Sequence, residues 1–263
     1  MTAATTPLLC QTRSAAGDEP APDPSRWSVL MALADGRLPT GAYAYSGGME
    51  QFVAWDDVTE LGDLDAWVAG RVGTAAPAGV QVAVAASVVA RSAPPRRWAP
   101  AFDALDRAVD ARTATAAGRT VSRQQARRWW RAARRCWPEE LAPLAEPIAS
   151  GRHAWVTLGA AAGMLGIAPA PLGTLVLYEL ISTPLWAAVR LLGLDPFDVA
   201  ALVTATLSWA EPPLAVLARR ATVDALSLCR GSGSTEWISW SVAPLADLAA
   251  EAHLEREERL FAS

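Results

Sequence analysis

The sequence predicts an all-α protein that folds as a single-domain helical bundle of roughly eight to ten helices. Along nearly every long segment, apolar residues recur at intervals of three and four, and the alternation typical of strands is hard to find. Short glycine- and proline-rich breaks separate these segments. With 263 residues, of which 52% are hydrophobic and 19% charged, the chain can bury a full core as a soluble globular protein.

The helical pattern begins after an N-terminal tail. Residues 1–24 contain four prolines and few large apolar groups, and they lack the basic start and apolar core of a signal peptide, so we expect a disordered tail. Residues 25–263 then form the helical domain. Its first helices are expected at residues 27–33, 64–72 and 102–109, where the apolar spacing is clearest. Breaks between helices are expected at residues 35–36, 94–95, 151, 168–171, 195–196 and 231–234.

Two apolar stretches, residues 75–90 and 172–194, are long enough to raise the question of a membrane. The first is too short to cross a bilayer of about 30 Å as a helix. The second is interrupted by Glu179, Pro184 and Arg190. We therefore expect two buried core helices and no membrane span.

A stripe of small residues runs through residues 159–166, which are mostly glycine and alanine. Where side chains are this short, two helix backbones can approach unusually closely. This helix is therefore expected to run through the centre of the bundle.

The charges of the chain are unevenly distributed. Residues 91–135 contain twelve arginines and three aspartates, a net charge of +9, while the rest of the chain carries −13. The basic residues Arg119, Arg123, Arg127, Arg131 and Arg135 recur every four positions along one helical stripe. Three interpretations stay open for this stripe: a solvated face, a surface for an acidic protein partner, and a nucleic-acid site. The overall charge of −4 and the lack of a recognised nucleic-acid module argue against the third.

A glycine-rich loop at residues 38–50 places Tyr43 and Tyr45 on a bend, which is typical of a contact surface. A phosphate-binding loop would need a lysine, and all 23 basic residues of this chain are arginine. A nucleophile elbow around Ser46 would need glycine where Ala44 stands, and the spacing of a dinucleotide-binding loop is absent. We therefore expect neither a nucleotide cofactor nor GTP hydrolysis by this chain.

Metal and redox sites are not predicted either. His153 and His253 are far apart, and neither has a cysteine or second histidine at helical ligand spacing, so surface or capped histidines are expected. The three scattered cysteines, Cys10, Cys136 and Cys229, fit reduced thiols in the cytoplasm. A hydrolase that used Ser46 and His253 stays an alternative, but it would require the fold to bring these residues together with an acid.

The C-terminal end carries two large apolar side chains, Leu260 and Phe261, after Arg259. Termini are usually polar unless something holds them, so these side chains are interpreted as exposed partner contacts. Charged residues just before them, including a Glu255 to Arg259 pair, predict a solvated helical face.

Two regions of the chain resemble the signature regions of the urease accessory protein UreF family. They are the loop at residues 38–50 and the tail at residues 244–263, with its His253 and Arg259-Leu260-Phe261-Ala262-Ser263. Gly118-Arg119 and the segment from His153 through Gly159 to Gly166 are also similar to the family. The chain departs from the family pattern at residues 192–195, where a glutamine is usual, and at Leu254, where a glutamate is usual.

The resemblance implies a non-enzymatic, cytoplasmic, homodimeric helical protein without a cofactor or metal of its own. It also implies binding to UreD (also called UreH), to the GTPase UreG and to the urease apoprotein (UreABC), so that nickel reaches the urease active site. The partner-binding residues that it suggests are Tyr43, Tyr45, Ser46, Glu50, Arg119, His253, Arg259, Leu260 and Phe261.

Overall fold

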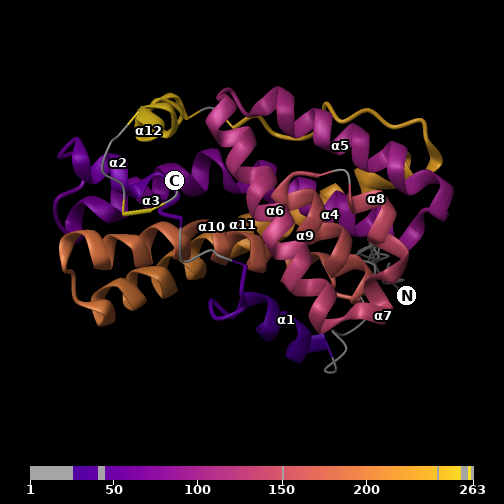
Figure 1. Cartoon of the computed structure of the whole chain (residues 1–263), viewed down its shortest axis with the longest axis horizontal. Helices are drawn as coiled ribbons and strands as arrows, with labels where there is room; N and C mark the ends of the chain where they lie inside the picture. The colour runs from indigo at the N-terminus through magenta and orange to yellow at the C-terminus, as the bar shows by residue number, and fades with distance from the viewer. Residues whose placement is uncertain (1–25, 41–44, 150, 242, 256–259, 262–263) are drawn as a thin grey trace, which may run out of the picture.

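The computed structural model describes residues 26–40, 45–149, 151–241, 243–255 and 260–261. Within these ranges the chain is all-α, as predicted, and contains no strand (Figure 1). Nine of the described helices have eight or more residues, in agreement with the expected number. The predicted tail at residues 1–24 lies outside the described residues.

Most of the helices follow one another with short connections. The longer ones are α1 (Trp27–Ala34), α3 (Leu61–Thr74), α4 (Ala76–Ser92), α5 (Trp98–Arg112), α6 (Ala116–Cys136), α9 (Ala154–Met164), α10 (Pro169–Leu192), α11 (Pro196–Arg230) and α12 (Pro244–Glu255). The short ones are α2 (Met49–Ala54), α7 (Pro138–Leu141) and α8 (Ala145–Ala149), with the 3-10 turns η3 (Pro95–Arg97) and η4 (Ala142–Leu144).

The two longest helices begin at a proline and are followed by a glycine, close to the breaks that the sequence pattern predicts. α10 begins at Pro169 and α11 at Pro196, first-turn positions where the missing proline N–H needs no partner. The residues that follow the two helices, Gly193 and Gly231, have φ angles of 66° and 79°. This left-handed conformation favours glycine, so both helices end sharply.

The centre of the bundle is the contact between α4 and α9. A Cβ atom added to Gly159 would lie 2.8 Å from the Cα of Ala83, and one added to Gly163 would lie 2.9 Å from the Cα of Ser87. The two backbones can lie this close only because both residues lack a side chain. Most of α9 is buried, which confirms that the small-residue helix runs through the centre.

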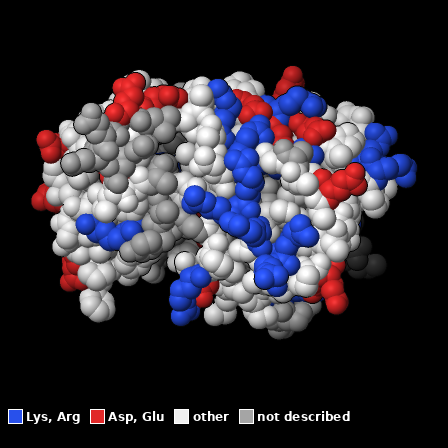
Figure 2. All heavy atoms as spheres, in the orientation of Figure 1, with Lys and Arg blue, Asp and Glu red and all other residues white. Residues whose placement is uncertain are grey.

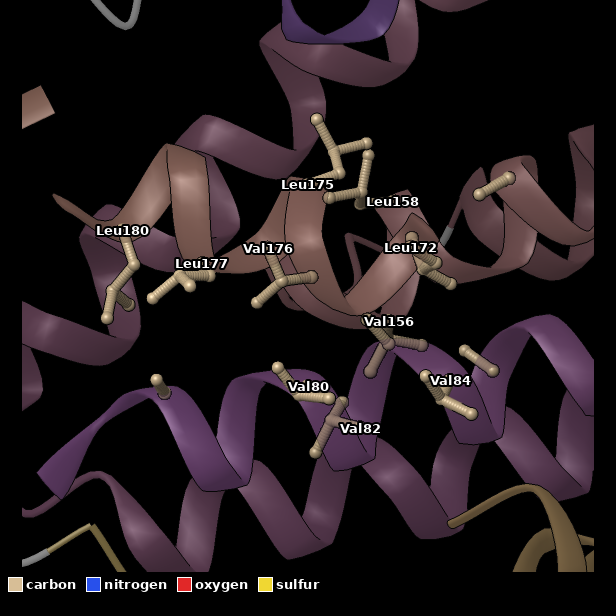
Figure 3. Close-up of a cluster of buried hydrophobic side chains, with 14 of the residues drawn as sticks. Val80, Val82, Val84, Val156, Leu158, Leu172, Leu175, Val176, Leu177 and Leu180 are labelled. Atoms are coloured by element: carbon tan, nitrogen blue, oxygen red, sulfur yellow. The ribbon is translucent and has the colours of Figure 1, made fainter. Parts of the chain in front are cut away.

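α10 and α11 pack against each other and against α4. Figure 3 shows Val80 of α4 facing Val176 of α10 across the core. The predicted core helices at residues 75–90 and 172–194 are thus confirmed. By length and composition alone, α10 and α11 could each cross a membrane, so the absence of a membrane role stays a prediction.

The end of the described chain lies beside its early helices. α12 packs on α2 and α6, and α1 packs on α10. Figure 1 shows α12, α2 and α3 gathered at one end of the molecule. Two segments that are far apart in the sequence therefore meet in space. They are the loop just before α2 and the described part of the C-terminal tail.

Candidate functional site

The carboxylate of Glu50, in the first turn of α2, joins the loop to the C-terminal tail. Its Oε1 accepts a hydrogen bond from the backbone N–H of Leu260 at 2.7 Å, and its Oε2 accepts one from the N–H of Phe261 at 3.1 Å. Hydrogen bonds to an ionised carboxylate are roughly twice as strong as neutral ones. We call this contact between Glu50, His253, Leu260 and Phe261 the tail joint.

His253, on α12, completes the tail joint. Its Nδ1 lies 3.7 Å from Oε2 of Glu50, and its Nε2 lies 3.3 Å from the carbonyl oxygen of Phe261. The residue is only 2% exposed, so the prediction of a surface histidine is wrong for His253. Three elements, α2, α12 and the tail, are fixed to one another through two buried polar side chains.

The two apolar residues of the tail have opposite environments. Phe261 is 4% exposed, and the guanidinium carbon of Arg190, on α10, lies 4.1 Å from the centroid of its ring. Leu260 is 65% exposed. The prediction of an exposed side chain is therefore correct for Leu260 and wrong for Phe261, because the Phe261 ring lies against Arg190 of α10.

The loop before α2 also turns inward. Gly47 and Gly48 have positive φ angles, as expected for a tight bend. Tyr45 is 1% exposed and Ser46 is fully buried, so the prediction that Tyr45 is presented on the surface is wrong. The Tyr45 ring instead lies under the guanidinium of Arg128, on α6, at 5.3 Å. Tyr43 and Arg259 lie outside the described residues.

The five arginines of the α6 stripe differ in their environment: two form hydrogen bonds within the protein, and three are exposed. Arg119 donates to the carbonyl oxygen of Ala114 at 3.2 Å, and Arg123 donates to Asp110 at 2.8 Å. The other three members of the stripe, Arg127, Arg131 and Arg135, are exposed. Figure 2 shows a band of basic side chains down the middle of this face. Only the exposed three are available to an acidic partner, and the role of Arg119 in partner binding stays a prediction.

A buried polar network holds the start of α9 against α5 and α6. His153 is fully buried, its Nε2 lies 2.9 Å from Oδ1 of Asp110, and its Nδ1 lies 3.0 Å from Oγ of Ser122. Burial lowers the pKa of His153 more than the Asp110 hydrogen bond raises it. A neutral ring can therefore donate to Asp110 and accept from Ser122. The prediction of a surface or capped side chain is also wrong for this histidine.

The geometry offers little to a hydrolase. Ser46 and His253 are both buried, so neither is presented to a substrate in solvent. Within the part of the chain that the structure describes, no group of three or more His, Cys, Asp or Glu side chains could hold a metal ion. Cys136 and Cys229 are free thiols, and Cys10 is outside the described residues.

Sequence reasoning missed the roles of two charged residues of α10, of which one lies at the tail joint and the other in a cavity. Arg190 covers the Phe261 ring, and Glu179 lines a cavity that Arg190 also lines. In the sequence both appeared only as interruptions of an apolar stretch. That interruption was the available signal, because a charged residue in a core helix usually has a specific partner or a functional role.

Known proteins are similar to this chain over most of its length. A family model described as UreF matches residues 58–207. The urease accessory protein UreF of Mycolicibacterium vanbaalenii is 37% identical over 239 residues, which cover 91% of this chain and 100% of that protein. The urease accessory protein UreF of Mycobacterium tuberculosis H37Rv is 35% identical over 240 residues, which cover 90% of this chain and 98% of that protein.

Proposed function

Because the chain belongs to the UreF family of urease accessory proteins, we propose that it binds UreD/UreH and recruits the GTPase UreG to the urease apoprotein (UreABC). In this role it supports nickel insertion in the cytoplasm and needs no catalytic site of its own. Nickel is a cargo of the assembly, not a resident cofactor of this chain.

The observation that carries this proposal is the tail joint. It combines the two signature regions into one surface, in which Glu50, His253 and Phe261 are buried and Leu260 is exposed. Two further leucines, Leu245 and Leu248, are exposed on α12 at a spacing that puts them on one helical face. Exposed apolar side chains held by a rigid buried support are typical of a protein–protein contact. We assign this surface to UreD/UreH.

The first prediction distinguishes the exposed Leu260, which is expected to contact the partner, from the buried Phe261, which is expected to support the surface. Leu260→Ala is expected to weaken UreD/UreH binding roughly tenfold without changing the melting temperature, because the side chain is exposed in the free protein. Phe261→Ala is expected to weaken binding and also to lower stability, since burying such a side chain contributes about 1.5 to 3 kcal/mol. Binding is measured by calorimetry with purified UreD/UreH, and function by urease activation in cells.

Met31→Ala serves as the control, because Met31 is a large apolar residue that is also exposed, on α1. It should leave binding and activation unchanged. The assignment of the surface would be contradicted if Leu260→Ala bound and activated like the parent chain, or if Met31→Ala weakened binding as much.

The homodimer is assigned to the outer face of α11. This helix has an exposed seven-residue repeat of mostly apolar side chains, the pattern of a helix that packs against another helix. Its two series are Trp209, Val216 and Val223, and Ala205, Pro212, Arg219 and Leu226. A 35-residue helix is about 50 Å long, enough to supply the roughly 1,200 Å² of a stable interface. In a twofold-symmetric dimer, the same face of α11 from a second copy of the chain would pack against it.

The second prediction tests this interface. The double variant Val216→Glu, Val223→Glu is expected to shift the protein from dimer to monomer in sedimentation equilibrium, because it buries two unpaired carboxylates. The variant Leu245→Glu, Leu248→Glu makes the same charge change on α12 and should leave the dimer intact. A parent chain that is monomeric at micromolar concentration, or that floats with lipid vesicles, would contradict the assignment.

A further inference from the structure

A cavity of about 420 Å³ lies between α1, the loop that follows it and one face of α10. Its volume is within the range of small-ligand sites. Tyr178 and Trp186 of α10 line it, together with the hydroxyl residues Thr40 and Thr183 and the carboxylate of Glu179. Glu179 also lines an adjoining hollow of about 120 Å³, so its carboxylate stands where two cavities meet.

The carboxylate of Glu179 is unusual because nothing neutralises it. Within the part of the chain that the structure describes, Glu179 forms no hydrogen bond and no ion pair. Burial among apolar groups raises its pKa to about 7. An unpaired acid in such a position costs stability, so its presence in a core helix calls for a compensating role.

The basic groups that face these cavities are already engaged elsewhere. Arg71, on α3, donates from Nε to the carbonyl oxygen of Leu180 at 3.0 Å and lies 5.4 Å from the Trp67 ring. Arg190 lies on the Phe261 ring and is three turns from Glu179, about 16 Å along the helix. Neither arginine forms an ion pair with Glu179.

Two acidic side chains, Glu179 and Asp35, line the cavity together with the basic Arg190, which lies about 16 Å from Glu179 along α10. Asp35, at the end of α1, lines the same cavity and pairs with Arg37 outside it. Burial raises the pKa of the Tyr178 hydroxyl, and the charges of Glu179 and Asp35 raise it further. Anionic ligands are therefore disfavoured at this end, and a cation is favoured.

The type of cation follows from the lining. One free carboxylate and a few hydroxyls are a poor ligand set for a divalent metal, which prefers several carboxylates or histidines. Aromatic rings beside a carboxylate suit an organic cation, whose charge interacts with both. We propose that this cavity binds an ammonium or guanidinium group, with Glu179 as its counter-ion and Tyr178 and Trp186 as its walls. The group can come from a small molecule or from an arginine side chain of another protein.

Binding is coupled to protonation with a defined sign. The cation pairs with the ionised carboxylate, so binding lowers the pKa of Glu179 and releases a proton near pH 7. With a pKa of about 7 in the free protein, roughly one tenth of the carboxyl groups are ionised at pH 6 and nine tenths at pH 8. Affinity should therefore rise roughly tenfold between these pH values.

The test is calorimetric titration of the full chain at pH 6, 7 and 8 with two probes: agmatine, and the peptide acetyl-Gly-Arg-Gly-amide. Binding of agmatine alone would assign the cavity to a free small cation, and binding of both to an arginine side chain as well. Glu179→Gln should lose at least tenfold in affinity at pH 8. Glu139→Gln, the same change at an exposed position of α7, should bind like the parent chain.

A second measurement does not depend on ligand affinity. The Glu179 carboxyl carbon is followed by NMR against pH, with a titration near pH 7 expected in the free protein and a lower one with agmatine. The folded state holds this proton to higher pH than the unfolded chain does, so Glu179 costs stability as pH rises above its unfolded pKa. Glu179→Gln should therefore melt at a higher temperature than the parent at pH 8, which also shows that it folds.

Three results would overturn the proposal. One is the absence of binding by either probe at millimolar concentration. The second is binding that is independent of pH or unchanged in Glu179→Gln. The third is a carboxyl that titrates below pH 5 in the free protein, which would show that Arg71 or another group already neutralises it.

Discussion

Gly159→Ala will destabilise the protein by about 3 kcal/mol or more, because the added methyl group has no space beside α4. Its Cβ would lie 2.7 Å from the carbonyl carbon of Ala83 and 2.8 Å from the Cα. Both atoms belong to the backbone of a helix buried over most of its length, so no flexible side chain can move aside. The melting temperature should fall by roughly 6 to 12 °C, given about 2 to 4 °C per kcal/mol for a chain of this size.

Gly70→Ala is the matched control. Gly70 lies within α3, and a Cβ there would meet nothing within 4 Å. This substitution should stabilise the protein by about 0.5 to 1 kcal/mol, because alanine loses less backbone entropy in a helix. Opposite signs for the two changes are expected in urea denaturation. Equal, small effects would show that α4 and α9 can separate without cost.

Arg152→Met is expected to cost about 3 to 5 kcal/mol, since it leaves a buried carboxylate without its counter-ion. Arg152 donates from Nη1 to Asp106 at 2.8 Å and from Nε to the carbonyl oxygen of Pro147 at 2.7 Å. Asp106 in turn accepts the backbone N–H of His153 at 2.9 Å. Loss of the arginine therefore affects the connection before α9 as well as the ion pair.

The exposed pair of Arg37 and Asp35 is the comparison. The Arg37 side chain is 92% exposed, and Arg37→Met should leave stability nearly unchanged, because solvent screens surface ion pairs. Urea denaturation of both variants measures the difference. If Arg152→Met were as mild as Arg37→Met, Asp106 would have to be hydrated or protonated in the folded state.

The parts of the fold that could be predicted from sequence are those set by local chemistry. The breaks at residues 168–171, 195–196 and 231–234 were predictable because proline and glycine act on their own backbone. The central position of α9 was predictable because Gly159 and Gly163 leave space that only a neighbouring backbone can use. These inferences need no knowledge of which helices become neighbours.

The environment of the tail joint could not be predicted in the same way. Tyr45 and Phe261 looked like surface contacts because their neighbours in sequence are glycines or charged residues. Their burial depends on partners far along the chain, Arg128 for Tyr45 and Arg190 for Phe261. Family resemblance pointed to residues that the structure brings together at the tail joint, but whether each side chain is exposed or buried required the tertiary structure.

The tail joint also bears on how the protein is made. The hydrogen bond between Glu50 and Leu260 links residues that are 210 positions apart. Because synthesis proceeds from the N-terminus, the early helices leave the ribosome long before Leu260 and Phe261 exist. Until then the Glu50 carboxylate has neither backbone donor, and a nascent or truncated chain that stops before residue 260 lacks the surface assigned to UreD/UreH. On the proposed assignment, a chain would become able to bind UreD/UreH only near the end of translation, and unfinished chains would be left out of the assembly.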